Sequence, residues 1–239
     1  MLSVAVLTTQ TLHHAFFVNE LSRCAKVELV VVETAVTAPI FAVAHPFETL
    51  RDNHEREVLF GGEERLVSFM VPELRVVSIN DTEASEALSG LNPDMVFVFG
   101  TSPIKAPLIE LCRGRLFNLH GGDPRQYRGL DSHLWAIYHR DFRALVTTLH
   151  EVALRLDTGA IVYQQALDVT QGLRLFELRA ANTRVCVELA RRAIAQHSAT
   201  GRVVTQPIKD LGRYYSFMPA VLKDICVLNF EKYTKKLSG

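Results

Sequence analysis

The residues best suited to chemistry are an amide, an imidazole and a carboxyl group from two separate stretches of the chain. Asn118 and His120 stand two residues apart at the end of an apolar run, so on a strand they would present their side chains on the same face. Such a pair can donate hydrogen bonds to an oxygen that gains negative charge, and Asp157, in a loop with Gly159, can reach the same edge. Spacing alone leaves an alternative open, in which Asn118 caps a turn, His120 is a half-buried histidine with satisfied hydrogen bonds, and Asp157 begins an Asx turn.

The elements that must position these side chains alternate between strands and helices. One helix is expected from about 12 to 23, with Phe16, Leu21 and Cys24 facing inward. Another begins at residues 81–84 and ends before Asn92. The short apolar runs that frame these helices are typical of strands buried on both faces: residues 3–7, 27–32, 74–78 and 95–99. This alternation predicts an α/β protein with a parallel sheet.

The second half continues the pattern. Strands are expected over 115–120, 145–150 and 160–169, with a helix around 132–138 between the first two. A long amphipathic helix follows, with four apolar residues at helical spacing: Leu175, Leu178, Val185 and Leu189. The carboxyl edge of a parallel sheet is where open α/β folds bind their ligands, which favours a site near His120.

Two regions fall outside this pattern. Residues 36–72 mix prolines, a cluster of acidic and basic residues from Arg51 to Glu57, and a glycine pair, and are interpreted as an insertion with some helix and unknown role. No linker or repeat precedes residue 200, so residues 1–200 are predicted to form one catalytic domain. Residues 201–239 are predicted to form a small C-terminal appendage.

Composition excludes several classes of protein. The chain has 239 residues, and its 26 basic residues balance 26 acidic ones, so no strong positive field attracts nucleic acid or an anionic membrane. No apolar run approaches the roughly 18 residues of a membrane-spanning helix, and the first residues lack the charged flank of a signal peptide. The four cysteines lie far apart, without a C-x-x-C pair that would suggest zinc. These features predict a cytoplasmic protein with reduced thiols and no metal.

Several separated motifs carry a resemblance to a known family. They are Phe117-Asn118-Leu119-His120, Tyr127-Arg128-Gly129, Val146-Thr147-Thr148-Leu149-His150 and Leu156-Asp157-Thr158-Gly159-Ala160-Ile161. In this order and spacing they resemble the folate-dependent formyltransferases, which include glycinamide ribonucleotide transformylase, methionyl-tRNA formyltransferase and the N-formyltransferases of nucleotide-linked amino sugars. The resemblance implies their fold, a Rossmann-like, mostly parallel twisted sheet with flanking helices.

The resemblance also implies a mechanism. Asn118, His120 and Asp157 become the catalytic set, the donor is N10-formyltetrahydrofolate and the acceptor is an amine. Asn118 and a protonated His120 would donate hydrogen bonds to the oxyanion of a tetrahedral intermediate. Asp157 would relay the proton, directly or through a water, and keep His120 protonated.

One loop departs from the family. Members commonly carry a Pro-Ser-Leu-Leu-Pro type of segment after the histidine, whereas this chain has Gly121-Gly122-Asp123-Pro124-Arg125-Gln126. The two glycines permit close approach of the backbone to a ligand. The change leaves the catalytic residues in place but weakens any assignment of the acceptor by analogy.

The same resemblance assigns binding segments. Donor contacts are expected on two loops, from Thr101, Ser102 and Ile104 and from Val152, Ala153 and Leu154. Acceptor contacts, to a phosphate in particular, are expected from Thr9, Gln10 and Thr11 after the first strand and from Arg128. For the loop residues an ordinary strand-to-helix connection is the alternative, and for Arg128 it is a structural role in tying down its loop.

Several acceptors remain open. A nucleotide-linked dideoxy amino sugar, used for surface polysaccharide, is favoured by the size of the chain and its short C-terminal extension. Hydroxyornithine in a siderophore pathway and glycinamide ribonucleotide are the alternatives, and a non-catalytic folate- or nucleotide-sugar-binding relative is the alternative of another class. A tRNA acceptor is set aside because about forty residues of modest basic character fall short of a tRNA-binding domain.

The appendage carries two further expectations. Its aromatic residues Tyr214, Tyr215 and Phe217 either stack a base or pack the appendage, and packing is favoured. Its apolar residues from Phe217 to Ile225 are expected to form an interaction face, in keeping with a homodimer. Removal of residues 201–239 is therefore expected to change assembly or acceptor binding rather than folate binding.

Overall fold

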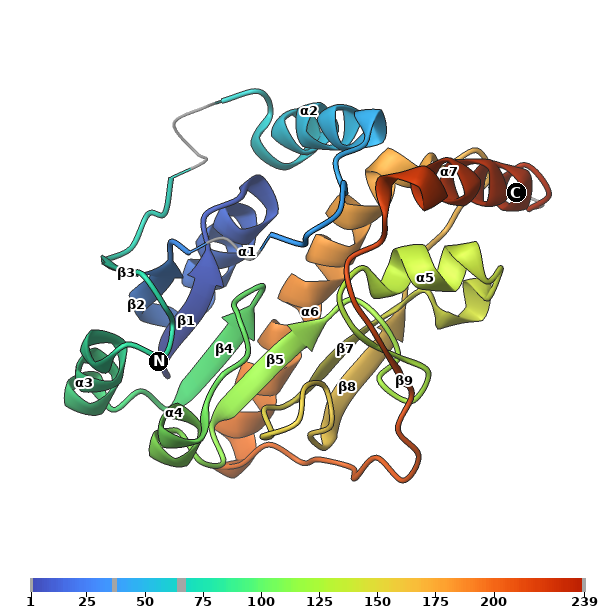
Figure 1. Ribbon diagram of the computed structural model, residues 1–239. Coiled ribbons are helices and arrows are strands. Elements are labelled where there is room, and N and C mark those ends of the chain that lie inside the picture. Colours follow the sequence, from blue (N-terminus) through green and yellow to red (C-terminus); the bar gives the residue numbers. More distant parts are fainter. Residues whose placement is uncertain (1, 36–37, 64–67, 238–239) are drawn as a thin grey trace.

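A seven-stranded sheet with helices on both faces forms the body of the molecule (Figure 1). The computed structural model describes residues 2–35, 38–63 and 68–237. The strand order is β3-β2-β1-β4-β5-β7-β8, in which the first five positions are parallel and β7 and β8 run antiparallel to their neighbours. This confirms the predicted fold class.

In the described residues of the first half, strands and helices alternate. Their bounds in chain order are β1 (Ser3–Thr9), α1 (Leu12–Ser22), β2 (Lys26–Glu33), α2 (Pro46–Phe60), β3 (Glu73–Val76), α3 (Thr82–Leu91), β4 (Met95–Phe99) and α4 (Ala106–Leu111). The segment interpreted as an insertion thus contains α2, a helix of four turns. His45 and Glu48 form a capping box at its start, and Gly61 ends it in the left-handed conformation.

The second half completes the sheet and adds a helical cover. Its elements are β5 (Leu116–His120), β6 (Tyr127–Gly129), α5 (Ser132–Tyr138), η2 (Phe142–Ala144), β7 (Val146–Glu151), β8 (Ile161–Ala166), η3 (Leu175–Glu177), α6 (Leu178–Thr200), β9 (Arg213–Tyr215) and α7 (Ala220–Thr234). Leu175 lies in the short turn η3 rather than in the long helix, which begins three residues later than its apolar spacing suggested.

Alternate residues of the central strand β1 point into two different cores. Val4 and Val6 pack on the side of α1 and α6, whereas Ala5 and Leu7 pack on the side of α3 and α4. This alternation is the signature of a strand buried on both faces. The parallel strands therefore meet at one carboxyl edge, above which α2, α5 and α7 lie (Figure 1).

The predicted inward residues of the first helix all contact the core beneath it. Leu21 is buried in that core, and Phe16 and Cys24 are half-buried and pack against it. The ring of Phe16 also meets that of Phe60 of α2 edge to face.

Residues 201–237 run along the body instead of standing apart from it. After α6 the chain passes below the sheet and rises along its edge to α7 (Figure 1). β9 pairs in parallel with β6, and α7 packs against α5. The ring of Tyr215 stacks on those of Tyr127 and Trp135, which is the packing role expected for this aromatic residue.

Candidate active site

Three of the polar side chains at the carboxyl edge of β5 come from two neighbouring strands. Asn118 and His120 project from the same face of β5, and the antiparallel register places His150 of β7 opposite Asn118. Asp157 lies in the loop between β7 and β8. The structure thus brings the three residues predicted from the sequence together and adds a second histidine to them.

His120 is buried and meets a hydrogen-bond acceptor at each ring nitrogen. Its Nε2 lies 2.9 Å from the carbonyl oxygen of Tyr127, and its Nδ1 lies 3.7 Å from Oδ2 of Asp157. The Tyr127 carbonyl can only accept, so Nε2 is the donor in that contact. Because 3.7 Å exceeds a normal hydrogen bond, Nδ1 is left able to contact a further group placed beside it.

Asp157 is held as a buried carboxylate. Its Oδ2 accepts a hydrogen bond of 2.7 Å from the Gly129 N–H, and its Oδ1 lies 3.4 Å from both Asn118 Nδ2 and His150 Nε2. Burial alone would raise the pKa of Asp157, but attraction to His120, together with hydrogen bonds from His150 and Gly129, outweighs burial and lowers it to about 2. Its backbone is left-handed, with φ of +52°, a conformation in which aspartate is enriched.

His150 belongs to one of the motifs described above, but the sequence alone assigned it no role. Its Nδ1 lies 2.7 Å from the carbonyl oxygen of Glu151, so this nitrogen carries a hydrogen and donates it there. Its Nε2 lies 3.2 Å from Asn118 Nδ2 and 3.4 Å from Asp157 Oδ1. Only the antiparallel register of β5 and β7 brings His150 to the site, and the sequence does not reveal that register.

The loop after His120, whose sequence differs from that of the family, fits closely around the imidazole. A Cβ on Gly122 would lie 2.8 Å from Ser132 Cβ and 2.9 Å from Nε2 of His120. Glycine at this position therefore allows the imidazole to reach the Tyr127 carbonyl.

A cleft of about 940 Å³ opens above these residues. Asn118, His120 and Asp157 line it, and so do residues from the carboxyl ends of β1, β2 and β4. Its further lining comes from α2, α5, α6 and the segment before α7, including Phe47, Arg51, Asp131, Arg179, Tyr214 and Phe217. The cleft is thus lined by residues from both halves of the chain.

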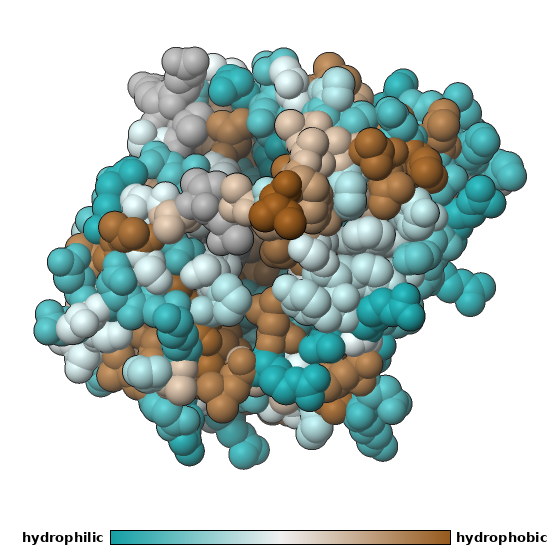
Figure 2. All heavy atoms as spheres, viewed as in Figure 1, coloured by the Kyte–Doolittle hydropathy of each residue, from teal (hydrophilic) through white to brown (hydrophobic). Residues whose placement is uncertain are grey.

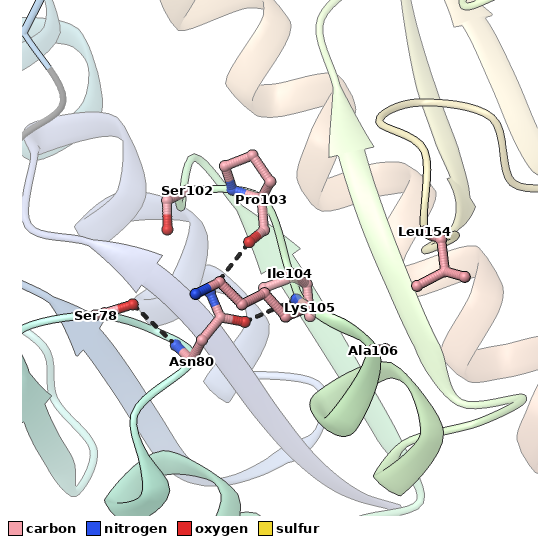
Figure 3. A pocket seen from close by; sticks show the side chains of 8 residues that line it. All are labelled: Ser78, Asn80, Ser102, Pro103, Ile104, Lys105, Ala106 and Leu154. Atoms are coloured by element: carbon pink, nitrogen blue, oxygen red, sulfur yellow. Dashed lines mark hydrogen bonds between the residues drawn. The ribbon is translucent and has the colours of Figure 1, made fainter.

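The two loops predicted to bind the donor face each other across a second, adjoining hollow of about 550 Å³ (Figure 3). Ser102 and Ile104 line it on one side and Leu154 on the other, while Thr101 and Ser102 also line the larger cleft. Val152 and Ala153 line neither of the two. The sequence therefore located both loops but not which residues face the cavities.

A buried carboxylate that sequence reasoning missed fixes one of these loops. Glu33, at the end of β2, accepts hydrogen bonds from the N–H and hydroxyl of Ser102, at 2.7 and 2.6 Å, and from the Ile79 N–H at 2.9 Å. Asn80 binds the same loop by donating to the Pro103 carbonyl and accepting from the Lys105 N–H (Figure 3). The wall shared by the two hollows is thereby anchored to β2 and to the turn after β3.

The residues predicted to receive the acceptor divide into two groups. Thr9, Gln10 and Thr11 line the cleft at the start of α1. Arg128 does not: it is buried, and its guanidinium donates to the carbonyl oxygens of Gly212, at 2.8 Å, and Leu156, at 3.2 Å. These contacts correspond to the structural alternative for Arg128.

Two buried histidines of α1 also line the cleft, and sequence reasoning passed over both. His13 and His14 lie with ring centroids 4.0 Å apart and meet Phe99 edge to face. Burial, opposed only in part by a hydrogen bond to Thr9, lowers the pKa of His14 to about 3. Burial, together with the charges of His14, Arg179 and Arg51, also lowers the pKa of His13 well below its usual range. Both rings are therefore neutral at pH 7.

Within the described residues, no cluster of three or more histidine, cysteine or acidic side chains is arranged to hold a metal ion. None of the helices in that part of the chain is long and apolar enough to cross a bilayer.

The family follows from a match that spans the site. Residues 18–188 match the model of the formyl transferase family, and this span includes Asn118, His120 and Asp157. The chain belongs to the formyl transferase family.

Individual relatives are distant. The bifunctional polymyxin resistance protein ArnA of Wigglesworthia glossinidia brevipalpis is 25% identical over 123 residues, which are 50% of this chain and 19% of that protein. The chain thus spans about a fifth of the length of this curated relative.

Two solved structures share the fold of this formyl transferase. Glycinamide ribonucleotide transformylase 1 of Symbiobacterium toebii has a TM-score of 0.58 and 19% identity, over 87% of this chain and 95% of that one. A 4-N formyltransferase of Francisella tularensis has a TM-score of 0.60 and 14% identity, over 96% and 87%.

Proposed function

We propose that this chain is an N-formyltransferase that moves a formyl group from N10-formyltetrahydrofolate to a primary amine. The observation that carries the proposal is the arrangement of Asn118, His120 and Asp157 at the carboxyl edge of the sheet, where all three line one cleft. Membership of the formyl transferase family supports the reaction type.

In the proposed reaction the amine attacks the formyl carbon, and the formyl oxygen becomes an oxyanion. Asn118 donates to this oxyanion through its amide, and His120 through its Nδ1–H, since Nε2 already contacts the Tyr127 carbonyl. Because both donors are positioned before the substrate binds, the site spends little energy on reorganisation during the reaction.

A proton must then pass from the attacking nitrogen to the leaving nitrogen of the folate. Asp157 is ionised at neutral pH and sits beside both oxyanion donors, so it can accept this proton directly or through a water. Its charge also stabilises the His120 imidazolium.

The smaller hollow is suited to the donor. A pterin ring is flat and carries polar atoms along its edge, which suits a hollow lined by apolar Ile104 and Leu154 and by polar Ser102 and Asn80. Its two loops are the ones that the sequence assigned to the folate.

For the acceptor we propose a nucleotide-linked dideoxy amino sugar, for surface polysaccharide synthesis. The arginines of the larger cleft, Arg51, Arg75 and Arg179, supply cationic groups near Thr9, Gln10 and Thr11. Tyr214 is exposed and lines the same cleft, where its ring can contact a base.

We further propose that the protein works in the cytoplasm as a homodimer. Its four cysteines, Cys24, Cys112, Cys186 and Cys226, are free, as suits a reducing compartment. Val221, Ile225 and Leu228 of α7 are exposed. Brown apolar side chains gather at the upper right of Figure 2, where Figure 1 shows α7. Light scattering of the protein, and of a Val221→Glu variant that should dissociate, tests the dimer.

The function is tested by incubating the protein with N10-formyltetrahydrofolate and a panel of amines. The panel contains dTDP- and UDP-linked amino sugars, the free amino sugars, hydroxyornithine and glycinamide ribonucleotide. Formylation of a nucleotide-linked sugar in preference to the others supports the proposal. Formylation of hydroxyornithine or glycinamide ribonucleotide would contradict the proposed acceptor but support the proposed reaction. Binding of tetrahydrofolate without transfer to any amine would indicate a non-catalytic relative.

A further inference from the structure

Helix α2 occupies an unusual place for a segment that connects two parallel strands. It lies above the carboxyl edge of the sheet, where it packs against α1, α6 and η3 (Figure 1). A helix in this place covers the mouth of the cleft rather than a face of the sheet. The composition of the segment had given it no role.

Paired charges fix the position of α2 at both ends. Near its end, Arg179 of α6 donates two hydrogen bonds to Glu55, at 2.6 and 2.7 Å, and Glu55 is fully buried. Near its start, buried Lys223 of α7 binds Glu48 at 2.6 Å. Burying charges costs desolvation energy, so such pairs specify a position more than they add stability.

The face held over the cleft carries one aromatic and one cationic side chain. Phe47 and Arg51 are one helical turn apart on α2, and both line the cleft. His13 of α1 and Arg179 of α6 line the same region. The neutral imidazole of His13 supplies hydrogen bonding here without charge.

The two arginines at this wall differ in how firmly they are paired. Arg179 contacts both Glu55 and Asp52, so moving it would leave a buried carboxylate without its partner. Arg51 pairs with Asp52 at 2.9 Å, and the side chain of Asp52 is 46% exposed and also contacts Arg179. Since Asp52 is partly solvated and keeps Arg179 as a partner, Arg51 can exchange Asp52 for an anion at little cost.

We propose that α2 is the acceptor-recognition element and that Arg51 binds a phosphate group of the acceptor, while Phe47 contacts an apolar part of the same molecule. This inference rests on the proposed function, whose acceptor it specifies as phosphorylated. Arg51 acts in binding, and the reacting atoms stay with Asn118, His120 and Asp157.

Isothermal titration with dTDP and with UDP tests the assignment on the full chain. The wild-type protein binds at least one of them, and Arg51→Ala weakens that binding about tenfold or more, because a charge-assisted hydrogen bond is lost. The matched control is Arg56→Ala, which removes the same charge from the same helix outside the cleft lining and leaves binding within twofold. Arg51→Lys restores part of the affinity, since lysine keeps the charge without the planar fork. Thermal unfolding of each variant shows whether it is folded.

Two results would overturn the inference: equal binding of the nucleotides by wild type and Arg51→Ala, or formylation of free amino sugars with no binding of either nucleotide. Tetrahydrofolate binding, measured in the same variants, separates this test from that of the function. Loss of nucleotide binding in Arg51→Ala with unchanged tetrahydrofolate binding supports the inference. Nucleotide binding that depends on Arg51, in a protein that transfers no formyl group, also supports it and contradicts only the enzyme activity.

Discussion

At the residue scale, the buried carboxylate and the imidazole beside it are the first targets. We predict that His120→Asn and Asp157→Asn each lower the turnover of formyl transfer about a hundredfold or more, because one removes a donor to the oxyanion and the other removes the proton relay. Steady-state assays with N10-formyltetrahydrofolate measure the effect.

The controls for these variants are His54→Asn and Asp168→Asn, which make the same changes outside the cleft lining. Near-normal turnover in His120→Asn or Asp157→Asn would remove that residue from the mechanism.

His150 gives a second prediction at this scale. It helps to hold the pKa of Asp157 at about 2, so His150→Gln raises that pKa toward the usual range of a carboxyl group. The variant should lose kcat/KM as the pH falls from about 5.5 to 4, where Asp157 of the wild type stays ionised. A pH profile with the same acid limb in both proteins would show that His150 does not act on Asp157.

The sequence alone located most of this site but not all of it. Asn118 and His120 were found because strand periodicity places them on one face, and Asp157 because its loop with Gly159 can reach the same edge; the resemblance then gave all three a catalytic role. His150 and Glu33 act through contacts with other strands, and the pairing of strands far apart in sequence leaves no local pattern. Arg128 is the opposite case, a residue that the sequence placed in the acceptor site. Its charge and position suggest a ligand contact, and only its hydrogen bonds to backbone carbonyls reveal the structural role.

At the scale of elements, the segment from β9 to the start of α7 supports the site. The Leu130 N–H donates to the Tyr215 carbonyl at 3.0 Å, and the Met218 N–H donates to Asp131 at 2.8 Å. The loop held in this way begins at Gly129, whose N–H binds Asp157.

We therefore predict that deletion of residues 201–239 abolishes formyl transfer and weakens folate binding, because the loop that holds Asp157 loses its support. The expectation from sequence, that folate binding would persist, is revised by these contacts. Titration of the truncated protein with tetrahydrofolate decides between the two, and unchanged affinity in a folded truncated protein would favour the earlier expectation.

The sequence predicted the strands of the large sheet and most helices because their apolar residues recur with a regular period. It predicted only some helix of unknown role where α2 lies, and the reason is physical. Two of the contacts that hold this helix are ion pairs of Glu48 and Glu55, so polar residues occupy inward positions that periodicity expects to be apolar.

At the scale of the whole molecule, buried neutral histidines make stability depend on pH. Burial lowers the pKa of His13 and His14, and it lowers that of His133 to about 4 although a hydrogen bond to Val146 opposes it. Above pH 6.5 these rings are neutral in both the folded and unfolded states and the effect vanishes. Below pH 6.5 the unfolded chain binds protons that the folded one does not, so stability falls as the pH falls.

We predict that the free energy of unfolding decreases between pH 6.5 and 4 by roughly 1.4 kcal/mol per pH unit for each such histidine. Urea unfolding at several pH values measures the slope, and His133→Gln should make it shallower. A free energy that stays constant over this range would show that these rings are protonated in the folded protein.

The contacts of Tyr215 and Met218 with the loop after β6 also bear on how the protein is made. Ribosomes extend a chain from its amino end, so β1 to β8 leave the ribosome before the segment that closes the cleft. A nascent chain that stops short of residue 218 has Asn118, His120 and Asp157 but lacks the contacts of that segment with the loop that binds Asp157. Translation itself would thus keep the catalytic centre incomplete until synthesis has passed residue 218.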